Sequence, residues 1–164
     1  MTGPPRCGKS TLIERVVQHL AQPATGFFTR EMRQGVRRVG FAIDTLDGKQ
    51  GVLAHQDVKG RFRVGKYGVN LADIDRIAVP SMRPGRPDEI VVVDEIGKME
   101  CFSPLFKQTL LQVLDSEHRV IGSIAAKGDR FIERIKTRAD VLLIHLSEST
   151  RDSAFSALLK HVKG

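Results

Sequence analysis

The first 20 residues read MTGPPRCGKSTLIERVVQHL, and the eight from Gly3 to Ser10 say most about the fold. These eight residues match the pattern G-x-x-x-x-G-K-[ST] without a gap. Apolar residues then recur at helical spacing as far as Leu20, and Pro23 follows where a helix is expected to end. A glycine-rich turn before a helix points backbone N–H groups at one place, which suits phosphate oxygens. The stretch therefore predicts a loop that binds a polyphosphate.

The residue types in this loop have separate expected roles. Lys9 is placed to neutralise the β- and γ-phosphates of a nucleotide, and the Ser10 hydroxyl to coordinate Mg²⁺. Arg6 departs from the common pattern, because many such loops carry a further glycine there and a larger residue is harder to hold at positive φ. Two placements of its side chain stay open: near the phosphates, where it adds positive charge, or pointing to solvent.

Two adjacent carboxylates follow an apolar run in the middle of the chain. Ile90–Val93 is short, wholly apolar and β-branched, which is typical of a strand buried on both faces. Asp94 and Glu95 then lie at the carboxyl end of the strand, where α/β sheets bind ligands. We expect Asp94 to hold Mg²⁺, directly or through water, and Glu95 to accept a proton from, or orient, an attacking water. Lys9 and Glu95 are the predicted catalytic residues, and Ser10 and Asp94 the predicted metal ligands.

The order of the remaining segments predicts the fold class. Residues 26–58 contain short, partly alternating runs between glycine-bearing turns, and Asp47-Gly48 is a hairpin signal. We therefore expect a small antiparallel β insertion from about 35 to 68. Strand-like and helix-like runs then alternate at 90–93, 103–116, 120–125, 129–138, 141–146 and 151–162. This order predicts one domain over residues 1–164, with an α/β fold that is a three-layer αβα sandwich around a mostly parallel sheet.

The start of the chain conflicts with this fold. A phosphate-binding loop of this kind normally follows a central strand, but only Met1 and Thr2 precede Gly3. Either the true start lies upstream, or the sequence is a fragment, or the sheet lacks a central member, and we favour the first. A version with about six more upstream residues is therefore expected to be more stable.

Composition and charge narrow the class of protein and the kind of partner. The net charge of +7 predicts an acidic partner, either nucleic acid or a polyphosphate, although the basic groups at Arg30–Arg38 and Lys59–Lys66 also fit a solvated face. Two cysteines give no disulfide framework, and no apolar run approaches the roughly 20 residues that span a bilayer. With no signal-like opening stretch either, we expect a cytoplasmic protein without membrane association, as a monomer or weak homo-oligomer.

Several segments, in order along nearly the whole chain, resemble one known family. They are Thr2–Leu12, Gly26–Thr29, Arg38–Phe41, Thr45–Gly48, Val64–Val69, Val93–Glu100 and Arg134–Arg138. The family is the thermostable-type (THEP-type) P-loop nucleoside-triphosphatases, called cancer-related nucleoside-triphosphatases in animals. The resemblance implies a RecA-like core and slow, Mg²⁺-dependent hydrolysis of ATP, GTP, CTP, TTP and UTP.

The resemblance also implies which residues contact the nucleotide. From the loop these are Gly3, Pro4, Pro5, Arg6, Cys7, Gly8, Lys9, Ser10 and Thr11, and from the strand segment Val91, Val92, Val93, Asp94, Glu95, Ile96, Gly97 and Lys98. Two departures matter: Arg6 replaces the usual glycine, and Thr150-Arg151-Asp152 stands where the family tends toward Asn-Arg-Asp. The second departure leaves the preferred base open.

Two other functions fit parts of the sequence. A P-loop kinase would transfer the γ-phosphate to a nucleotide or small acceptor, which the insertion could house. A nucleic-acid-associated NTPase would explain the net charge, but 5% aromatic residues give little support for stacking platforms.

The roles of five further residues also stay open. Lys98 is a candidate γ-phosphate contact or an ion-pair partner of Glu95. Tyr67 either stacks on a base or packs in the protein. One of Arg134, Lys136 and Arg138 could act as an arginine finger, although an exposed basic helix face is favoured.

Overall fold

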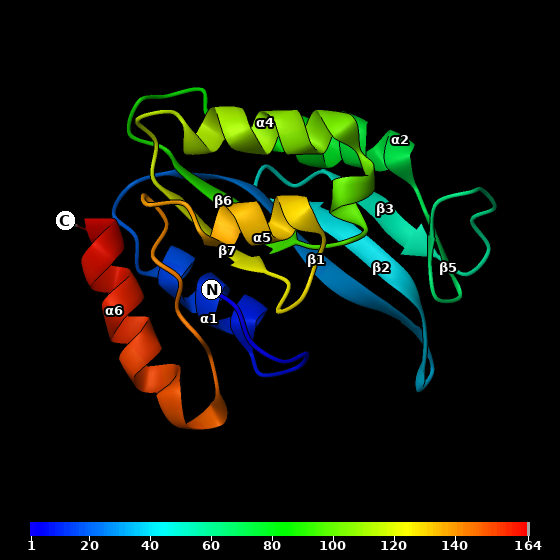
Figure 1. Ribbon diagram of the computed structural model, residues 1–164, viewed down its shortest axis with the longest axis horizontal. Coiled ribbons are helices and arrows are strands. Elements are labelled where there is room, and N and C mark those ends of the chain that lie inside the picture. The colour runs from blue at the N-terminus through cyan, green and yellow to red at the C-terminus, as the bar shows by residue number, and fades with distance from the viewer. Residues whose placement is uncertain (164) are drawn as a thin grey trace.

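The computed structural model describes residues 1–163 and contains one seven-stranded mixed sheet between two layers of helices (Figure 1). The strands lie in the order β4-β5-β3-β2-β1-β6-β7. Their bounds are β1 (Ala24–Gln34), β2 (Arg37–Thr45), β3 (Gln50–His55), β4 (Arg63–Val64), β5 (Tyr67–Val69), β6 (Ile90–Ile96) and β7 (Val120–Ile124). The α/β class and the expected layers are therefore confirmed.

Helices cover both faces of the sheet. The α-helices are α1 (Lys9–Gln18), α2 (Leu71–Asp73), α3 (Val79–Ser81), α4 (Pro104–Leu114), α5 (Arg130–Lys136) and α6 (Arg151–Lys163). One π-helical turn, η1 (Ile74–Ala78), and two 3₁₀ turns, η2 (Glu100–Phe102) and η3 (Glu148–Thr150), complete the regular structure of this part of the chain. Within residues 1–163, none of the helices combines the length and the hydropathy that crossing a bilayer requires.

The first four residues of β6, Ile90–Val93, are all apolar because helices cover both faces of the strand. Val91 and Val93 point into a core that includes α4 and α5, whereas Ile90 and Val92 point into a core that includes α1 and α6. Successive side chains of a strand face opposite sides, so a strand covered on both sides needs apolar residues at every position. The four side chains are at most 2% exposed, and the buried strand predicted at 90–93 is confirmed.

The expectation of a mostly parallel sheet needs correction. Only β1 with β6 and β6 with β7 pair in parallel, whereas β1 with β2, β2 with β3, β3 with β5 and β4 with β5 pair antiparallel. The hairpin predicted at Asp47-Gly48 joins β2 to β3, and Gly48 has a φ of 87° as such a turn requires. Short turns of this kind can only join antiparallel strands, so hairpins replace crossover helices in this half of the sheet.

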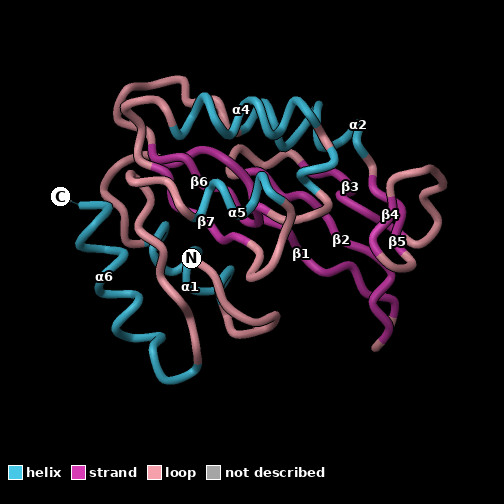
Figure 2. Tube along the Cα trace, in the orientation of Figure 1, coloured by secondary structure: helices cyan, strands magenta, loops and turns pink. Residues whose placement is uncertain are grey.

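One long strand carries the antiparallel part. The first residues of β1 pair with β6 as far as Phe28 opposite Asp94, and the residues from Thr29 to Gln34 continue past that point, paired with β2. We call Thr29–Gln34 together with β2, β3, β4 and β5 the wing. In Figure 2 the tip of the β1–β2 hairpin projects beyond the rest of the sheet. Antiparallel pairing thus begins in β1, earlier than the expected position 35.

The strand predicted at 141–146 is reduced to one isolated bridge between His145 and Thr2. Thr2 donates its N–H to Ile144 O (2.9 Å) and accepts from Leu146 N (2.8 Å), while Met1 O accepts from Ile124 N of β7 (2.8 Å). The first two residues therefore lie between β7 and residues 144–146. Met1 bonds to β7, and Thr2 bonds to residues 144–146. Apart from this bridge, residues 141–146 form no regular strand. A cavity of about 460 Å³ is lined in part by Met1, Val120–Ile124 and Leu142.

Candidate functional site

The loop from Gly3 to Ser10 turns tightly between Thr2 and α1. Gly8 caps α1 with a φ of 92°, in the left-handed region that favours glycine. At Gly3, an added Cβ atom would lie 2.5 Å from Leu146 O, so only glycine fits between the loop and the C-terminal segment. The two glycines of the sequence pattern are thus both required by the backbone.

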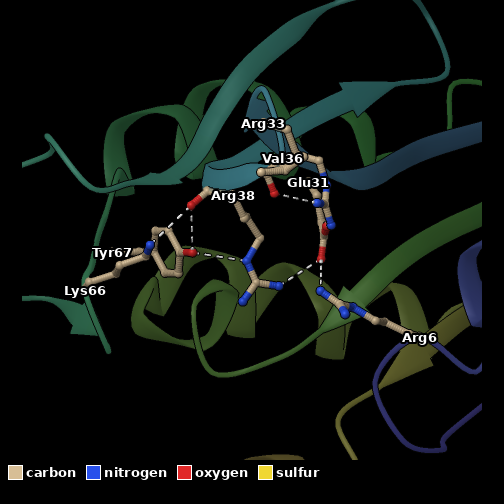
Figure 3. A network of polar contacts seen from close by, with 7 residues as sticks. All are labelled: Arg6, Glu31, Arg33, Val36, Arg38, Lys66 and Tyr67. Atoms are coloured by element: carbon tan, nitrogen blue, oxygen red, sulfur yellow. Dashed lines mark hydrogen bonds and ion pairs between the residues drawn. The ribbon is translucent and has the colours of Figure 1, made fainter.

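Arg6 adopts a φ of 64°, so the position does require the left-handed conformation that the missing glycine would favour. Holding a non-glycine residue there costs about 1 kcal/mol. Its side chain is 75% exposed, and its Nη2 lies 3.9 Å from Glu31 Oε1 of β1 (Figure 3). Of the two placements left open, the structure thus favours the solvent-facing one, with the guanidinium turned toward the wing.

Lys9 lies across the loop. Its Nζ donates to Gly3 O and to Pro4 O, each at 3.1 Å, so the ammonium group stands over the backbone that would surround a phosphate. Arg151, the first residue of α6, supports the loop from the other side: its Nε donates to Cys7 O at 3.2 Å. An added Cβ at Gly8 would lie 3.4 Å from the same nitrogen. The Arg151 guanidinium of the C-terminal helix α6 therefore packs directly against the loop.

Asp94 is a buried carboxylate with one oxygen unpaired. It is 1% exposed, and its Oδ1 accepts a hydrogen bond from the Ser123 hydroxyl of β7. Its Oδ2 has no hydrogen-bond partner among the described residues. Burial raises the pKa of Asp94, which Ser123, the Ser10 hydroxyl and the Lys9 ammonium partly offset.

This arrangement fits a magnesium ion. A buried carboxylate oxygen without a partner is costly unless a cation or a donor satisfies it. Mg²⁺ prefers hard oxygen ligands and keeps several waters or phosphate oxygens, so one carboxylate and one hydroxyl suffice from the protein. Ser10 and Asp94 supply those two groups on facing elements, α1 and β6.

Glu95 lies half-buried next to Asp94, across a cis peptide bond. Burial raises the pKa of its carboxyl group, Lys9 lowers it and Asp94 raises it further. A raised pKa brings a carboxylate closer to the value that suits a general base at neutral pH. The structure thus brings the four predicted catalytic and metal-binding residues to one edge of the sheet.

Glu100 is a third carboxyl group close by, to which sequence reasoning gave no role. It lies on η2 and is 4% exposed. An added Cβ at Gly97 would lie 2.9 Å from Glu100 Oε2 and 3.7 Å from Glu95 Cγ, so the two glutamate side chains flank Gly97. Burial, helped by the nearby charges of Glu95 and Asp94 and opposed by two backbone hydrogen bonds, raises the pKa of Glu100 to about 8. Glu100 is therefore mostly uncharged at pH 7.

The buried Glu100 predicts a pH-dependent stability. An acid whose pKa rises on folding stabilises the fold fully below its unfolded pKa of 4.5, and that stability is lost as the pH rises toward 8. Between pH 5 and 7.5 the wild type should lose on the order of 3 kcal/mol of unfolding free energy that Glu100→Gln retains. Urea unfolding of the nucleotide-free protein at both pH values measures the difference. Parallel pH dependences in wild type and variant would contradict it.

The other predicted contact residues divide by exposure. Val91, Val92, Val93 and Ile96 are buried in the two cores, where they hold β6 in place, and Lys98 is exposed. No ion pair between Lys98 and Glu95 occurs within residues 1–163. Of the loop residues, Pro4, Pro5 and Thr11 are exposed and Cys7 is buried.

The structure also favours one of the alternative roles left open for Tyr67, Lys136 and Arg138. Tyr67 is 8% exposed and packs: its hydroxyl accepts from Arg38 Nε at 3.1 Å. Arg138 pairs with Asp115 at 2.8 Å and also with Asp140, and Lys136 pairs with Glu133 at 2.9 Å. These ion pairs favour structural roles for both.

Comparisons with known proteins agree on the class. A family model described as NTPase matches residues 1–159. The chain is 44% identical to the nucleoside-triphosphatase THEP1 of Thermotoga maritima over 99% of this chain and 94% of that protein. It is 37% identical to the human cancer-related nucleoside-triphosphatase over 93% and 89%. The crystal structure of THEP1 from Aquifex aeolicus superposes with a TM-score of 0.87 at 30% identity, covering 99% of this chain and 97% of that one.

Proposed function

Because this chain belongs to the NTPase family and hydrolyses nucleoside triphosphates, we propose that it removes the terminal phosphate with Mg²⁺ and accepts several bases. The observation that supports this most is the unpaired Asp94 Oδ2 beside Ser10 and Lys9. The contacts that we propose are mainly to the triphosphate, which every nucleoside triphosphate shares. Broad base tolerance follows from that.

The phosphate loop binds and orients the substrate. Backbone N–H groups of the loop and the N-terminus of α1 hold the phosphate oxygens, and Lys9 turns from Gly3 O and Pro4 O to the β- and γ-phosphates. Ser10 and Asp94 would hold Mg²⁺, which would supply positive charge that neutralises those phosphates. Ser123 fixes the Asp94 carboxylate through Oδ1 and leaves Oδ2 free for the ion.

Glu95 acts on the attacking water. Its carboxylate takes a proton from the water as the water oxygen bonds to the γ-phosphorus. The bond from the γ-phosphorus to the bridging oxygen breaks, and that oxygen leaves with the nucleoside diphosphate. Glu100, mostly uncharged beside Gly97, adds little negative charge to that of Asp94 and Glu95 at pH 7.

Phosphate release from ATP, GTP, CTP and UTP, each with Mg²⁺ and with EDTA, tests this function. We expect release from all four within about tenfold of one another, and at least a hundredfold loss with EDTA. Release unaffected by EDTA would contradict the role of Mg²⁺. Release that begins only when a nucleotide or sugar acceptor is added would favour a kinase instead.

The surroundings of the protein are also a proposal. Cys7 and Cys101 are buried free thiols, and burial raises the pKa of Cys101 to about 12, which keeps it unreactive. Both thiols support a reducing, cytoplasmic environment. We propose that the chain forms a single domain and acts as a monomer or weak homo-oligomer.

A further inference from the structure

The wing and the end of β1 that leads into it carry most of the excess positive charge of the chain. Residues 30–67 contain nine Lys and Arg against four Asp and Glu, an excess of five in a chain whose net charge is +7. The four acids include Asp44 and Asp47, which lie toward the β2–β3 hairpin. The opposite end of the wing is therefore the more basic one.

The fold brings the two basic groups of the sequence to that one end. Lys66, in the turn between β4 and β5, donates to Arg38 O at 3.3 Å, and Arg37 donates to Gln56 Oε1 at 3.1 Å. Figure 3 shows Lys66 and Tyr67 beside Arg38. Lys59 and Arg61 precede β4 and are exposed, so they add to the same end.

The wing does not neutralise this charge internally. Glu31 Oε1 lies 2.8 Å from Arg38 and 3.9 Å from Arg6, and the same carboxylate also pairs with Arg33 (Figure 3). Three guanidinium groups thus share one carboxylate. Their side chains are 75%, 45% and 36% exposed for Arg6, Arg33 and Arg38. A surplus of positive charge therefore faces solvent.

The basic end of the wing also extends past the nucleotide site. Six residues of β1 continue past the one paired with Asp94, which corresponds to about 20 Å of strand. Arg6 belongs both to the phosphate loop and to the charge cluster around Glu31. A long anion on the wing would therefore lie next to the nucleotide without occupying its site.

We propose that the basic end of the wing binds double-stranded nucleic acid through its phosphate backbone, independently of sequence. A two-stranded β-ribbon is the size that a duplex groove admits, and the β1–β2 hairpin projects as such a ribbon with Val36 95% exposed in its turn. A single strand is disfavoured, because its non-specific binding relies on exposed aromatic faces, whereas Tyr67 is buried and Phe41 and Phe62 are half-buried. A duplex supplies a continuous line of negative charge, which the surplus positive charge of the wing would attract.

Fluorescence anisotropy with a labelled 20-base-pair DNA, in a series of salt concentrations, tests this proposal. Arg37→Glu/Arg61→Glu changes two exposed wing residues outside the nucleotide site. The matched control Arg86→Glu/Lys160→Glu makes the same change in net charge elsewhere on the surface. We expect at least a tenfold loss of affinity at 100 mM salt for the wing variant and less than threefold for the control. The slope of log affinity against log salt should fall by about 2 for the wing variant.

Three results would overturn the proposal. One is equal loss in the wing and control variants, which would mean attraction by overall charge. Another is absence of binding to the duplex at 50 mM salt. The third is preference for a labelled single strand, or for phosphatidylserine vesicles, over the duplex. Phosphate release without nucleic acid should be unchanged in both variants, which shows that they remain folded.

Discussion

Glu95→Gln is expected to lower phosphate release by about 10²- to 10³-fold while leaving nucleotide affinity within threefold. The change removes the group that we propose accepts the proton of the attacking water, and general bases contribute this much to a rate. The amide keeps the size of the side chain, so the packing against Gly97 persists. Single-turnover phosphate release with saturating ATP and Mg²⁺ measures the chemical step, and a fluorescent nucleotide measures the affinity.

A pH profile gives the same prediction a second readout. Burial raises the pKa of Glu95, so the wild-type rate should fall as the pH drops below that raised value and protonates the base. The acid limb should disappear in Glu95→Gln. Glu117→Gln, an exposed residue outside the site, is the matched control and should behave as wild type. A Glu95→Gln enzyme within threefold of the wild-type rate would remove Glu95 from the mechanism.

Lys9→Ala should lose about 10²- to 10³-fold in kcat/KM for every nucleoside triphosphate. The ammonium group is held over the loop by Gly3 O and Pro4 O, where the substrate charge would lie. Removing one preorganised positive contact to the transferring phosphate is worth roughly 3–4 kcal/mol. Unlike the Glu95 variant, this one should also weaken binding, because in our proposal Lys9 contacts the phosphates already in the ground state.

Kinetics with ATP and GTP, together with direct binding, separate the two parts of the Lys9 prediction. Lys160→Ala, an exposed lysine on α6, controls for loss of one positive charge. Lys9→Arg should not restore activity, since the larger planar guanidinium does not fit the position of a compact ammonium. Retention of more than a third of kcat/KM in Lys9→Ala would show that the loop binds phosphate in another way.

Local patterns predicted most of the site because each part of it is contiguous in sequence. The loop reads directly from Gly3 to Ser10, and the buried strand with its two carboxylates reads from Ile90 to Glu95. The hairpin at Asp47-Gly48 was equally local. In each case the residues that determine the local structure are also the residues of the pattern that was recognised.

The parts that the sequence did not predict depend on distant pairs. Ser123 of β7 donates a hydrogen bond to Asp94 of the neighbouring strand β6. In the sequence, only a serine near the end of a strand-like run indicated this contact. The pairing of Arg6 with Glu31 joins a loop to a strand 25 positions away. The segment 141–146 has a strand-like composition, but among the described residues it pairs only through the bridge between His145 and Thr2.

We propose that water, positioned by Glu95, attacks the terminal phosphorus. Hydrolysis of ATP in ¹⁸O-labelled water, with both products analysed by mass spectrometry and no acceptor present, tests it most directly. We expect ADP and phosphate in equal amounts, with one solvent oxygen in each phosphate and none in ADP. Solvent oxygen in ADP, release of AMP with pyrophosphate, or no phosphate until an acceptor is added would contradict it.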